Sequence, residues 1–353
     1  MIPGPRLMAL ESRALHRIPL LLTTLLIALL ALSLLPLSPA RADEYHVDRI
    51  GGADRYAVAA NTALTYHTPE FPTDTVYIAS GQIYSDALGA GAAAAGDGNA
   101  VLLLTRQGSL PTATVKALEK LRPRTIKVIG GTATISSSVE NALKPYALER
   151  VVRIAGKDRY EVAANVSRDL GAWSGTVYVA SGAGFSDAVA AAGFASVLGD
   201  PVLLTSPGGL PSSIAAELRR MQPERIVVVG GAASVSDGVL ASLRSYGPTV
   251  RVGGADRYEV SVNLSKDLSG RFQQFAGDHR LYFGTVTSGT AFADSLSAAN
   301  LHQPVLFTRP TALPSTVTPA FARYGIEYVT IVGGEATVST AVERQLWGLT
   351  PSV

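Results

Sequence analysis

The chain has 353 residues, of which 47% are hydrophobic and 16% are charged, which is enough to bury the cores of two or three domains. This composition excludes an intrinsically disordered protein. Because cysteine is absent, disulfide bonds, thiolate metal sites, a cysteine nucleophile and a lipid-modified cysteine are excluded as well.

The N-terminal segment differs in kind from the rest of the chain. Three arginines precede an apolar run at 20–35, which is 16 residues long, and a membrane-spanning helix needs roughly 20. The segment ends on the small-x-small pattern of Ala40 and Ala42. We predict a secretory signal peptide, residues 1–42, with an uncleaved N-terminal anchor helix as the alternative.

Cleavage of this segment would change the charge of the protein. It removes four of the 30 basic residues and one of the 28 acidic residues, which leaves 26 and 27. A nearly neutral mature chain does not support a general attraction to polyanions or to membranes. We therefore expect no nucleic acid partner, and no membrane partner after signal cleavage.

One short turn sequence recurs three times: "GGADRY" at 51–56, "AGKDRY" at 155–160 and "GGADRY" at 253–258. The text after each turn recurs too, through a Ser-Gly loop, a "VLLLT", "PVLLT" or "PVLFT" run and a glycine pair. The mature chain is thus three copies of one module. We place the repeats at 43–148, 149–248 and 249–353.

Each copy alternates short apolar runs with helical stretches. The runs from Val76, Val101 and Ile126 in the first copy are almost entirely apolar, which is typical of parallel strands covered on both faces. Such an order predicts an α/β fold of three tandem repeated modules with mostly parallel sheets. Because the linkers are short, we expect an intramolecular pseudo-threefold array.

The aspartate of each recurring turn stands where a helix begins. In the second and third copies a glutamate follows three residues later, at Glu161 and Glu259, as in a capping box. We therefore expect a structural role as helix caps for Asp54, Asp158 and Asp256.

The arginine of each turn lies in the first helical turn, where a cation opposes the helix dipole. Its partner is either an internal carboxylate, which would make an ion pair, or an anionic ligand, and the sequence leaves both open. The tyrosine beside it either stacks on a sugar or is buried. The candidate carboxylates, which recur after each Ser-Gly loop, are Asp86, Asp187 and Asp294.

The Ser-Gly loops lead from a predicted strand into a predicted helix, where exposed backbone N–H groups form anion sites, although tight turns use the same residues.

No catalytic pattern is present: the four histidines of the mature chain occupy no equivalent positions and have no metal-ligand spacing. We expect no enzyme activity, no metal and no cofactor.

The long repeated signature "RIGGADRYAVAAN", "RIAGKDRYEVAAN" and "RVGGADRYEVSVN", with "SDAL", "PVLLT" and "VGG" after it, resembles the cell wall binding repeat type 2 modules of Gram-positive bacteria. The resemblance covers roughly residues 46–350. It implies α/β modules packed as a trimer within one chain, which hold an exported protein non-covalently to an anionic secondary polymer of the wall. Such repeats are often joined to an effector such as an amidase, for which few residues remain here.

The resemblance implies a location in the cell wall or at the cell surface, and an anionic glycopolymer or peptidoglycan itself as partner. Two departures, Ala57 for glutamate and Ala293 for serine, argue against equal affinity in all modules. A wall hydrolase or amidase and a solute receptor remain the alternatives. The expected ligand-binding residues are Arg55, Tyr56, Arg159, Tyr160, Arg257, Tyr258, Ser80, Gly81, Ser181, Gly182, Ser288 and Gly289.

Overall fold

The described part of the chain is a single unit within Glu44–Val353. The structure is a computed structural model, and it describes residues 45–65, 73–88, 90–97, 100–170 and 173–349. The predicted signal peptide at 1–42 lies outside the described residues. Within the described ranges, no helix is both long and apolar enough to cross a bilayer.

The strands form three sheets of four, and every strand pair is parallel. The first sheet has the order β3 (Ala100–Thr105), β2 (Thr75–Ser80), β4 (Thr125–Ile129), β5 (Arg150–Ile154). The second has the order β7 (Val202–Thr205), β6 (Thr176–Ser181), β8 (Arg225–Val229), β9 (Thr249–Val252). The third has the order β11 (Val305–Thr308), β10 (Tyr282–Ser288), β12 (Ile326–Val332), β1 (His46–Ile50). The predicted fold of three α/β modules with parallel sheets is confirmed.

Helices follow the strands in the same order in each module. Those after the recurring turn are α3 (Arg55–Leu64), α7 (Arg159–Arg168) and α11 (Arg257–Ala276). Those after the Ser-Gly loop are α4 (Ala90–Gly96), α8 (Ser186–Leu198) and α12 (Phe292–Ser297), which continues as η2 (Ala298–Leu301). The outer helices are α5 (Thr112–Leu121), α9 (Ser212–Met221), α13 (Thr318–Arg323), α6 (Ser137–Leu143) with η1 (Lys144–Tyr146), α10 (Asp237–Leu243) and α14 (Thr340–Trp347).

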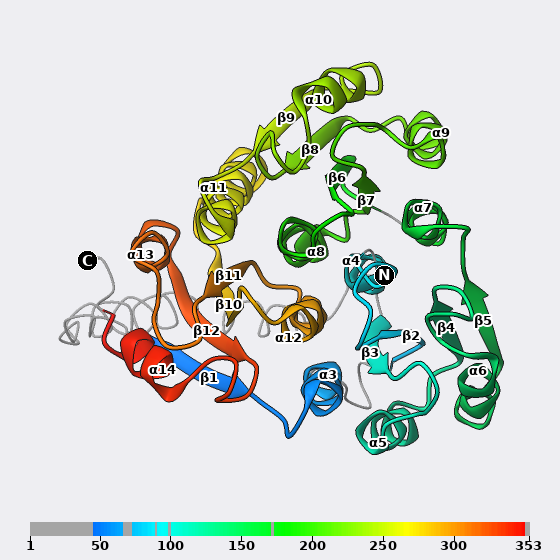
Figure 1. Cartoon of the computed structure of the whole chain (residues 1–353). Coiled ribbons are helices and arrows are strands. Elements are labelled where there is room, and N and C mark those ends of the chain that lie inside the picture. Colours follow the sequence, from blue (N-terminus) through cyan, green and yellow to red (C-terminus); the bar gives the residue numbers. More distant parts are fainter. Residues whose placement is uncertain (1–44, 66–72, 89, 98–99, 171–172, 350–353) are drawn as a thin grey trace, which may run out of the picture. The chain divides into compact units, whose positions relative to one another are not determined.

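The helices α4, α8 and α12 meet where the three modules meet (Figure 1). Helices α4 and α8 are rich in alanine and contain glycine, and these small residues let the elements approach closely. A Cβ on Gly91 would lie 2.8 Å from the Cβ of Ala299, and one on Gly193 would lie 2.3 Å from Val305. The small side chains of the central helices thus permit the pseudo-threefold array.

The chain crosses from one module to the next immediately before each recurring turn, which the sequence did not predict. Strand β5 pairs with β4 of the first sheet, but the helix that follows, α7, packs on β7 and α9 of the second module. The N-terminal strand β1 completes the third sheet by pairing with β12, and α3 then packs on the first module. Each module therefore contributes to the sheet of its predecessor. The predicted boundaries at 148 and 248 remain predictions, and β5 and β9 begin just after them.

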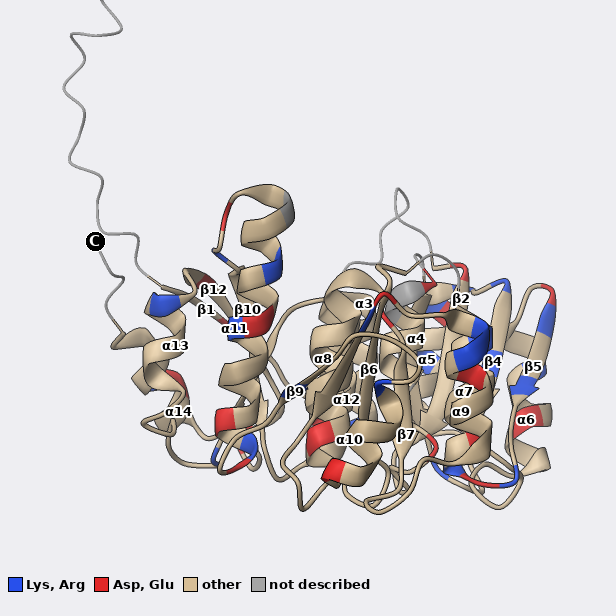
Figure 2. Cartoon of the chain, turned by 90° about the horizontal axis from the view of Figure 1, so that it is seen from above, with Lys and Arg blue, Asp and Glu red and all other residues tan. Residues whose placement is uncertain are grey.

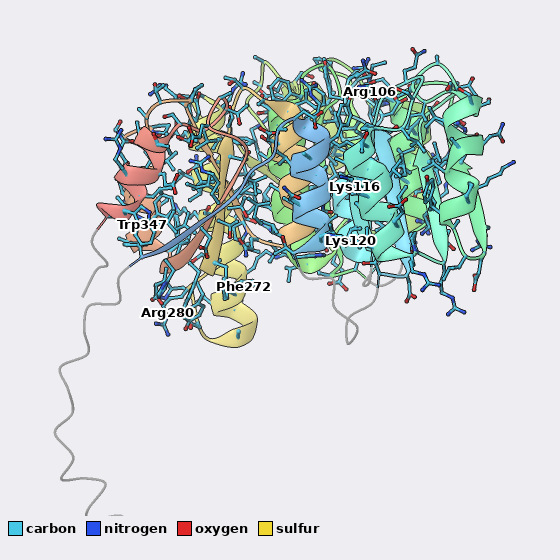
Figure 3. All side chains as sticks on the ribbon, turned by 90° about the horizontal axis from the view of Figure 1, so that it is seen from below. Arg106, Lys116, Lys120, Phe272, Arg280 and Trp347 are labelled. Atoms are coloured by element: carbon cyan, nitrogen blue, oxygen red, sulfur yellow. The ribbon has the colours of Figure 1, made fainter. Side chains whose placement is uncertain are left out.

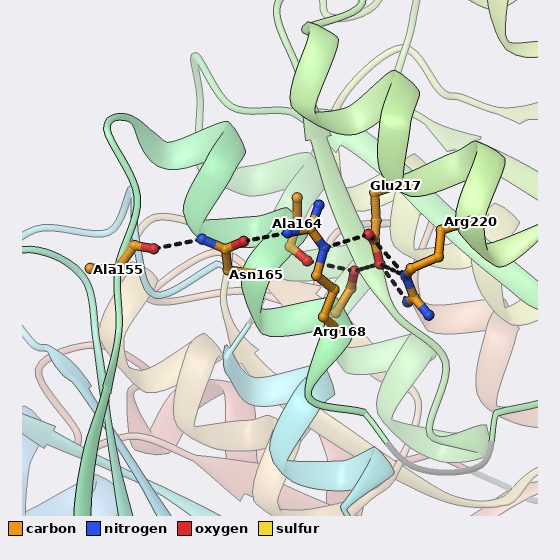
Figure 4. A network of polar contacts seen from close by, with 7 residues as sticks. Ala155, Ala164, Asn165, Arg168, Glu217 and Arg220 are labelled. Carbon is orange, nitrogen blue, oxygen red and sulfur yellow. Dashed lines mark hydrogen bonds and ion pairs between the residues drawn. The ribbon is translucent and has the colours of Figure 1, made fainter.

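A buried acidic side chain joins two helices of the second module (Figure 4). Glu217 is fully buried on α9, and its carboxylate accepts hydrogen bonds from Ser167 Oγ at 2.7 Å and Arg168 Nε at 2.9 Å, both on α7. It also pairs with Arg220 at 2.6 Å. Burial by itself would raise the pKa of Glu217, but the hydrogen bonds from Arg220, Ser167 and Arg168 outweigh burial and lower it.

Replacing Glu217 with glutamine is expected to destabilise the protein at neutral pH and to flatten its acid unfolding. A carboxylate whose folded pKa lies below its unfolded pKa stabilises the fold above the unfolded pKa of about 4.5, and that stability is lost as the pH falls through the folded pKa. Melting temperatures of both proteins between pH 7 and pH 3 measure this. A difference in melting temperature between the two proteins that stays constant across that range would contradict a lowered pKa of Glu217.

Candidate ligand-binding site

The recurring turns lie at the carboxyl ends of the strands, where open α/β sheets bind their ligands. The aspartate of each turn caps the helix: its Oδ1 accepts from the backbone N–H groups two and three residues on, at 3.0 and 2.9 Å. An asparagine of the helix also binds the start of the turn. In the first module, Asn61 Nδ2 donates at 2.7 Å to the carbonyl oxygen of Gly51. Asp54, Asp158 and Asp256 thus hold the backbone of the turns.

The arginine of each turn is bound to the Ser-Gly loop of its own module. Its Nη1 donates to the carbonyl oxygen of the loop glycine, at 2.5 Å in the first two modules. The pairs are Arg55 with Gly81, Arg159 with Gly182 and Arg257 with Gly289. A guanidinium has five N–H donors, so this bond leaves others available.

The three recurrent aspartates after the loops do not pair with these arginines. Among the described residues none of them forms an ion pair within 4.0 Å; Asp86 accepts from Thr134 Oγ1 at 2.6 Å, and Asp294 from Thr337 Oγ1 at 2.7 Å. The predicted internal ion pair is therefore absent. The physical reason is that each arginine turns toward the loop carbonyl, while each aspartate faces the turn after the glycine pair.

The charges nevertheless meet across the module boundaries. Burial raises the pKa of Asp187 and of Asp294, whereas the hydroxyl of Ser234 or Thr337 and a guanidinium act in the opposite direction. That guanidinium belongs to the next module around the array: Arg257 acts on Asp187, and Arg55 acts on Asp294. Arg257 and Arg55 thus lie at junctions between modules.

Replacing Asp294 with asparagine is expected to leave the protein as stable or more stable at pH 7. A raised folded pKa means that the carboxyl stabilises the fold fully below its unfolded pKa of about 3.8, and that this contribution is lost as the pH rises through the folded pKa. Relative to the variant, the wild type should become more stable as the pH falls from 6 to 4. Melting curves at both pH values test this, and a variant that is less stable only at pH 7 would refute it.

Three aromatic rings lie together where the central helices begin. Tyr84, Phe185 and Phe292 occupy the same position in the three copies, and their ring centroids are 6.0, 6.0 and 6.2 Å apart. The guanidinium of Arg55 lies 5.6 Å from the ring of Phe292, and that of Arg257 lies 5.5 Å from the ring of Phe185. Sequence reasoning missed this aromatic trio, although an aromatic residue precedes "SD" or "AD" in every copy.

The tyrosine of each turn packs on the Ser-Gly loop. Tyr56 and Tyr258 are 5% and 9% exposed, and Tyr160 is half-buried. A Cβ on the loop glycine, Gly81, Gly182 or Gly289, would come within 2.7 to 3.0 Å of the tyrosine Cε1. Any larger residue at these three positions would therefore force the tyrosine ring to shift.

Two further arginines cover tyrosine rings on their other side. Arg106 lies 4.7 Å from the ring of Tyr56, and Arg309 lies 5.1 Å from that of Tyr258, whereas the second module has Ser206 at this position. Figure 3 places Arg106 at the loop-rich edge of the molecule. In the first and third modules, the guanidinium groups of Arg106 and Arg309 are therefore exposed, and the tyrosine rings beneath them are buried.

The serines of the Ser-Gly loops bind their own loops. Ser80 Oγ accepts from the N–H groups of Gln82 and Ile83, at 3.1 and 3.0 Å. Ser181 and Ser288 accept in the same way from Ala183 and Thr290, both at 3.2 Å. These contacts tie up N–H groups of the loops that the sequence offered as an anion site.

A second arginine in each module was also missed. In each sheet, an arginine of the strand next to the glycine pair donates to the carbonyl oxygen of the first glycine of that pair. The same arginine binds an acidic residue in the first turn of the helix that follows the glycine pair. In the third sheet, Arg49 binds the Gly333 carbonyl at 3.0 Å and Glu343 at 2.8 Å. The repeat-equivalent residues are Arg49, Arg153 and Arg251. The "RIGG", "RIAG" and "RVGG" runs carried that signal.

A cavity of about 390 Å³ lies at the junction of the third and first modules. It is lined by 52–55 of the first turn, by 290–294 of the third Ser-Gly loop and by Thr337 among others, so it joins Arg55 and Asp294 in one space. Blue and red segments mix along the edge that carries these loops, at the bottom of Figure 2. Within the described residues no group of three or more His, Asp or Glu side chains is placed to hold a metal ion.

Three tandem α/β modules with one arginine-bearing turn each define an α/β repeat protein. The family model described as cell wall binding domain 2 (CWB2) matches residues 49–140, 153–240 and 251–343. The chain belongs to this family.

Two relatives come from Bacillus subtilis (strain 168). The "Amidase enhancer" is 31% identical over 306 residues, 85% of this chain and 40% of that protein. "N-acetylmuramoyl-L-alanine amidase LytC" is 30% identical over 319 residues, 89% of this chain and 61% of that protein. This chain thus spans less than two thirds of either relative.

Two solved structures share the fold, both from Clostridium difficile. Cwp6 has a TM-score of 0.77 at 22% identity, over 88% of this chain and 48% of Cwp6. Cwp8 has a TM-score of 0.73 at 22% identity, over 87% of this chain and 52% of Cwp8. The family and its relatives together support cell-wall binding by this chain.

Proposed function

We propose that the protein is exported and attaches non-covalently to an anionic secondary polymer of the Gram-positive cell wall. The observation that carries the proposal is the position of Arg55 and Arg257 at the junctions, each against a ring of the aromatic trio. One polymer chain would meet a cation from each module. Three weak contacts on one polymer gain effective concentration without any new contact.

The arginines are suited to such a ligand because they are already oriented. The bond to a loop carbonyl and the aromatic ring below fix the side chains of Arg55 and Arg257 before the ligand arrives. Their remaining N–H donors form charge-assisted hydrogen bonds to phosphate or carboxylate oxygens. Pre-organisation of this kind lowers the entropic cost of binding.

We infer that the three modules bind and do not catalyse. The family description names binding, and the amidase activity in the name of one relative is that relative's own, a protein of which this chain spans 61%. Asp86 and Asp294 accept hydrogen bonds from the hydroxyl groups of Thr134 and Thr337, which tie each aspartate to the turn after the glycine pair and suit a structural role.

The proposal is tested by pull-down of the purified protein on isolated cell walls, before and after acid extraction of the secondary polymers. We expect binding that disappears with the polymer and weakens as the salt concentration rises. Binding that survives extraction would identify peptidoglycan as the ligand and overturn the polymer assignment. Absence of binding to intact walls would overturn the wall-binding proposal as a whole.

A further inference from the structure

The first module carries a line of exposed cations on its outer helix. Arg106 directly follows β3, Lys116 and Lys120 lie four residues apart on α5, and Arg122 is the C-cap of that helix. Figure 3 shows Arg106, Lys116 and Lys120 in one line, which runs from the loop-rich edge along α5. Because the ten residues of α5 span about 15 Å, this line is at least that long. We call these four residues the basic stripe.

The basic stripe is continuous with the turn arginine of the first module. The guanidinium of Arg106 lies 4.7 Å from the ring centroid of Tyr56. Burial raises the pKa of Tyr56, whereas the guanidinium groups of Arg106 and Arg55 act in the opposite direction, so both cations lie near this phenol. The stripe therefore begins where the wall polymer would meet the first module.

The charges of the basic stripe are only partly neutralised within the protein. Among the described residues, neither its two lysines nor Arg122 has an ion-pair or side-chain hydrogen-bond partner. Arg106 has one carboxylate nearby, that of Asp54 at 3.9 Å, and the exposed Glu119 lies between the two lysines in sequence. Four cations thus accompany two carboxylates, and the stripe keeps a local excess of positive charge on a nearly neutral chain.

The fold does not require these cations. Helix α9 of the second module spans the ten corresponding residues, and its C-cap Gln222 has the same left-handed backbone conformation as Arg122, with φ of 48° and 46°. Only the position of Lys120 is basic in every module, because a cation stabilises the C-terminus of a helix. The residues at the positions of Arg106, Lys116 and Arg122 are Ser206, Ala216 and Gln222 in the second module and Arg309, Pro319 and Gly325 in the third.

The arrangement of the stripe indicates the shape of its ligand. Lys116 and Lys120 are separated by about 6 Å along the helix axis, and Arg106 and Arg122 extend the line at its two ends. A small anion needs donors that converge on one point, and it cannot bridge cations spread along a helix. A linear polymer with a negative charge in each repeating unit can contact them one after another.

We propose that the polymer held by the turn arginine of the first module continues along the basic stripe, over Lys116 and Lys120 to Arg122. This inference rests on the proposed function and names the first module as the main anchor of the array. Anionic groups of successive units pair with successive cations. Exposed ion pairs of this kind are weak one by one, but several on one polymer chain act together.

Sedimentation of the purified protein with isolated cell walls, at low and at raised salt concentration, tests the proposal. The stripe variant combines Lys116→Ala, Lys120→Gln and Arg122→Gln, and two of these changes install residues that the second module already carries. We expect its affinity for walls to fall at least about fivefold at low salt, because several surface ion pairs are lost together. The difference from the wild type should shrink as salt rises, because salt screens exposed charges. The melting temperature should stay close to that of the wild type, since all three side chains are exposed.

A matched control removes the same charge elsewhere on the surface. It combines Lys144→Gln, Arg244→Gln and Lys266→Gln, three exposed cations that have no ion-pair partner among the described residues. We expect this control to bind walls as the wild type does. Equal losses in the control and the stripe variant would show that only the overall charge matters and would overturn the proposal. Wild-type affinity in the stripe variant would overturn it as well.

Failure of this proposal is distinguishable from failure of the proposed function. If the wild type does not bind intact walls, or if its binding survives extraction of the secondary polymers, the proposed function fails. If binding is lost on extraction and on replacement of Arg55, Arg159 and Arg257, while the stripe variant binds as the wild type does, the basic stripe alone is refuted. A loss in the stripe variant that persists on extracted walls would assign the stripe to another wall component, such as an acidic protein, and would overturn the polymer path.

Discussion

Replacing Arg55, Arg159 and Arg257 together with glutamine is expected to weaken binding to intact cell walls by at least about 100-fold, because each charge-assisted hydrogen bond contributes roughly 1.5–3 kcal/mol and tenfold in affinity is about 1.4 kcal/mol. Each single replacement should cost less than the triple one, because the remaining modules still hold the polymer. Sedimentation of the protein with walls over a range of concentrations measures the change.

Controls must separate lost ligand contacts from lost architecture, because each arginine also holds a loop carbonyl. The triple lysine protein keeps the charges and one donor to the carbonyl but loses the planar fork. We expect it to melt near the wild-type temperature and to bind walls with intermediate affinity. Wall binding by a folded triple glutamine protein at wild-type strength would refute a ligand role. A triple glutamine protein that fails to fold, beside a triple lysine protein that binds walls as the wild type does, would assign the arginines to architecture.

The modules and their parallel sheets could be predicted because local patterns determine them. Short apolar runs are read directly as buried parallel strands, and Asp54 with its two counterparts stands at a helix start in the sequence as in the structure. Strand exchange between modules left no such pattern. Strand β1 has five residues, and its partner β12 lies at the opposite end of the chain, so their pairing depends on contacts that no local periodicity records.

The candidate site was predictable in its residues but not in their partners. The repeat singled out Arg55 and its counterparts, and it singled out the Ser-Gly loops as well. The carbonyl acceptors depend on how the turn and the loop of one module fold together, which no local periodicity records. The aromatic ring beside Arg55 belongs to the neighbouring module, so it follows only from how the modules pack. The sequence did not single out Tyr84, Phe185 and Phe292, because only the packed array brings them together.

The position of Tyr77 has different polar contacts in different modules. In the first module, Lys127 Nζ lies 2.7 Å from both Asp97 and Asp169 and 3.0 Å from Tyr77 Oη. In the third module, Thr285 takes the position of that tyrosine and donates to Gln303 Oε1 at 3.0 Å. A charged network and a neutral pair thus hold equivalent places in one fold.

Lys127→Met is expected to lower the free energy of unfolding by about 3 kcal/mol, because it leaves two carboxylates at one partly buried place without their cation. The Lys127 side chain is 12% exposed, so water cannot replace it fully. Denaturant unfolding of the variant measures the loss against Lys116→Met, an exposed lysine whose replacement should cost less than about 0.5 kcal/mol.

The neutral pair of Thr285 and Gln303 supplies the second half of the test. If charge imbalance causes the loss, a protein with Asp97→Asn and Asp169→Asn added to Lys127→Met should recover most of the stability, since it then has neutral groups at this place, as that pair has. Equal stability of Lys127→Met and Lys116→Met would show instead that the network contributes nothing measurable. A triple variant that remains as unstable as Lys127→Met would place the loss in packing of the lysine stem against Tyr77, whose ring lies 4.8 Å from Nζ.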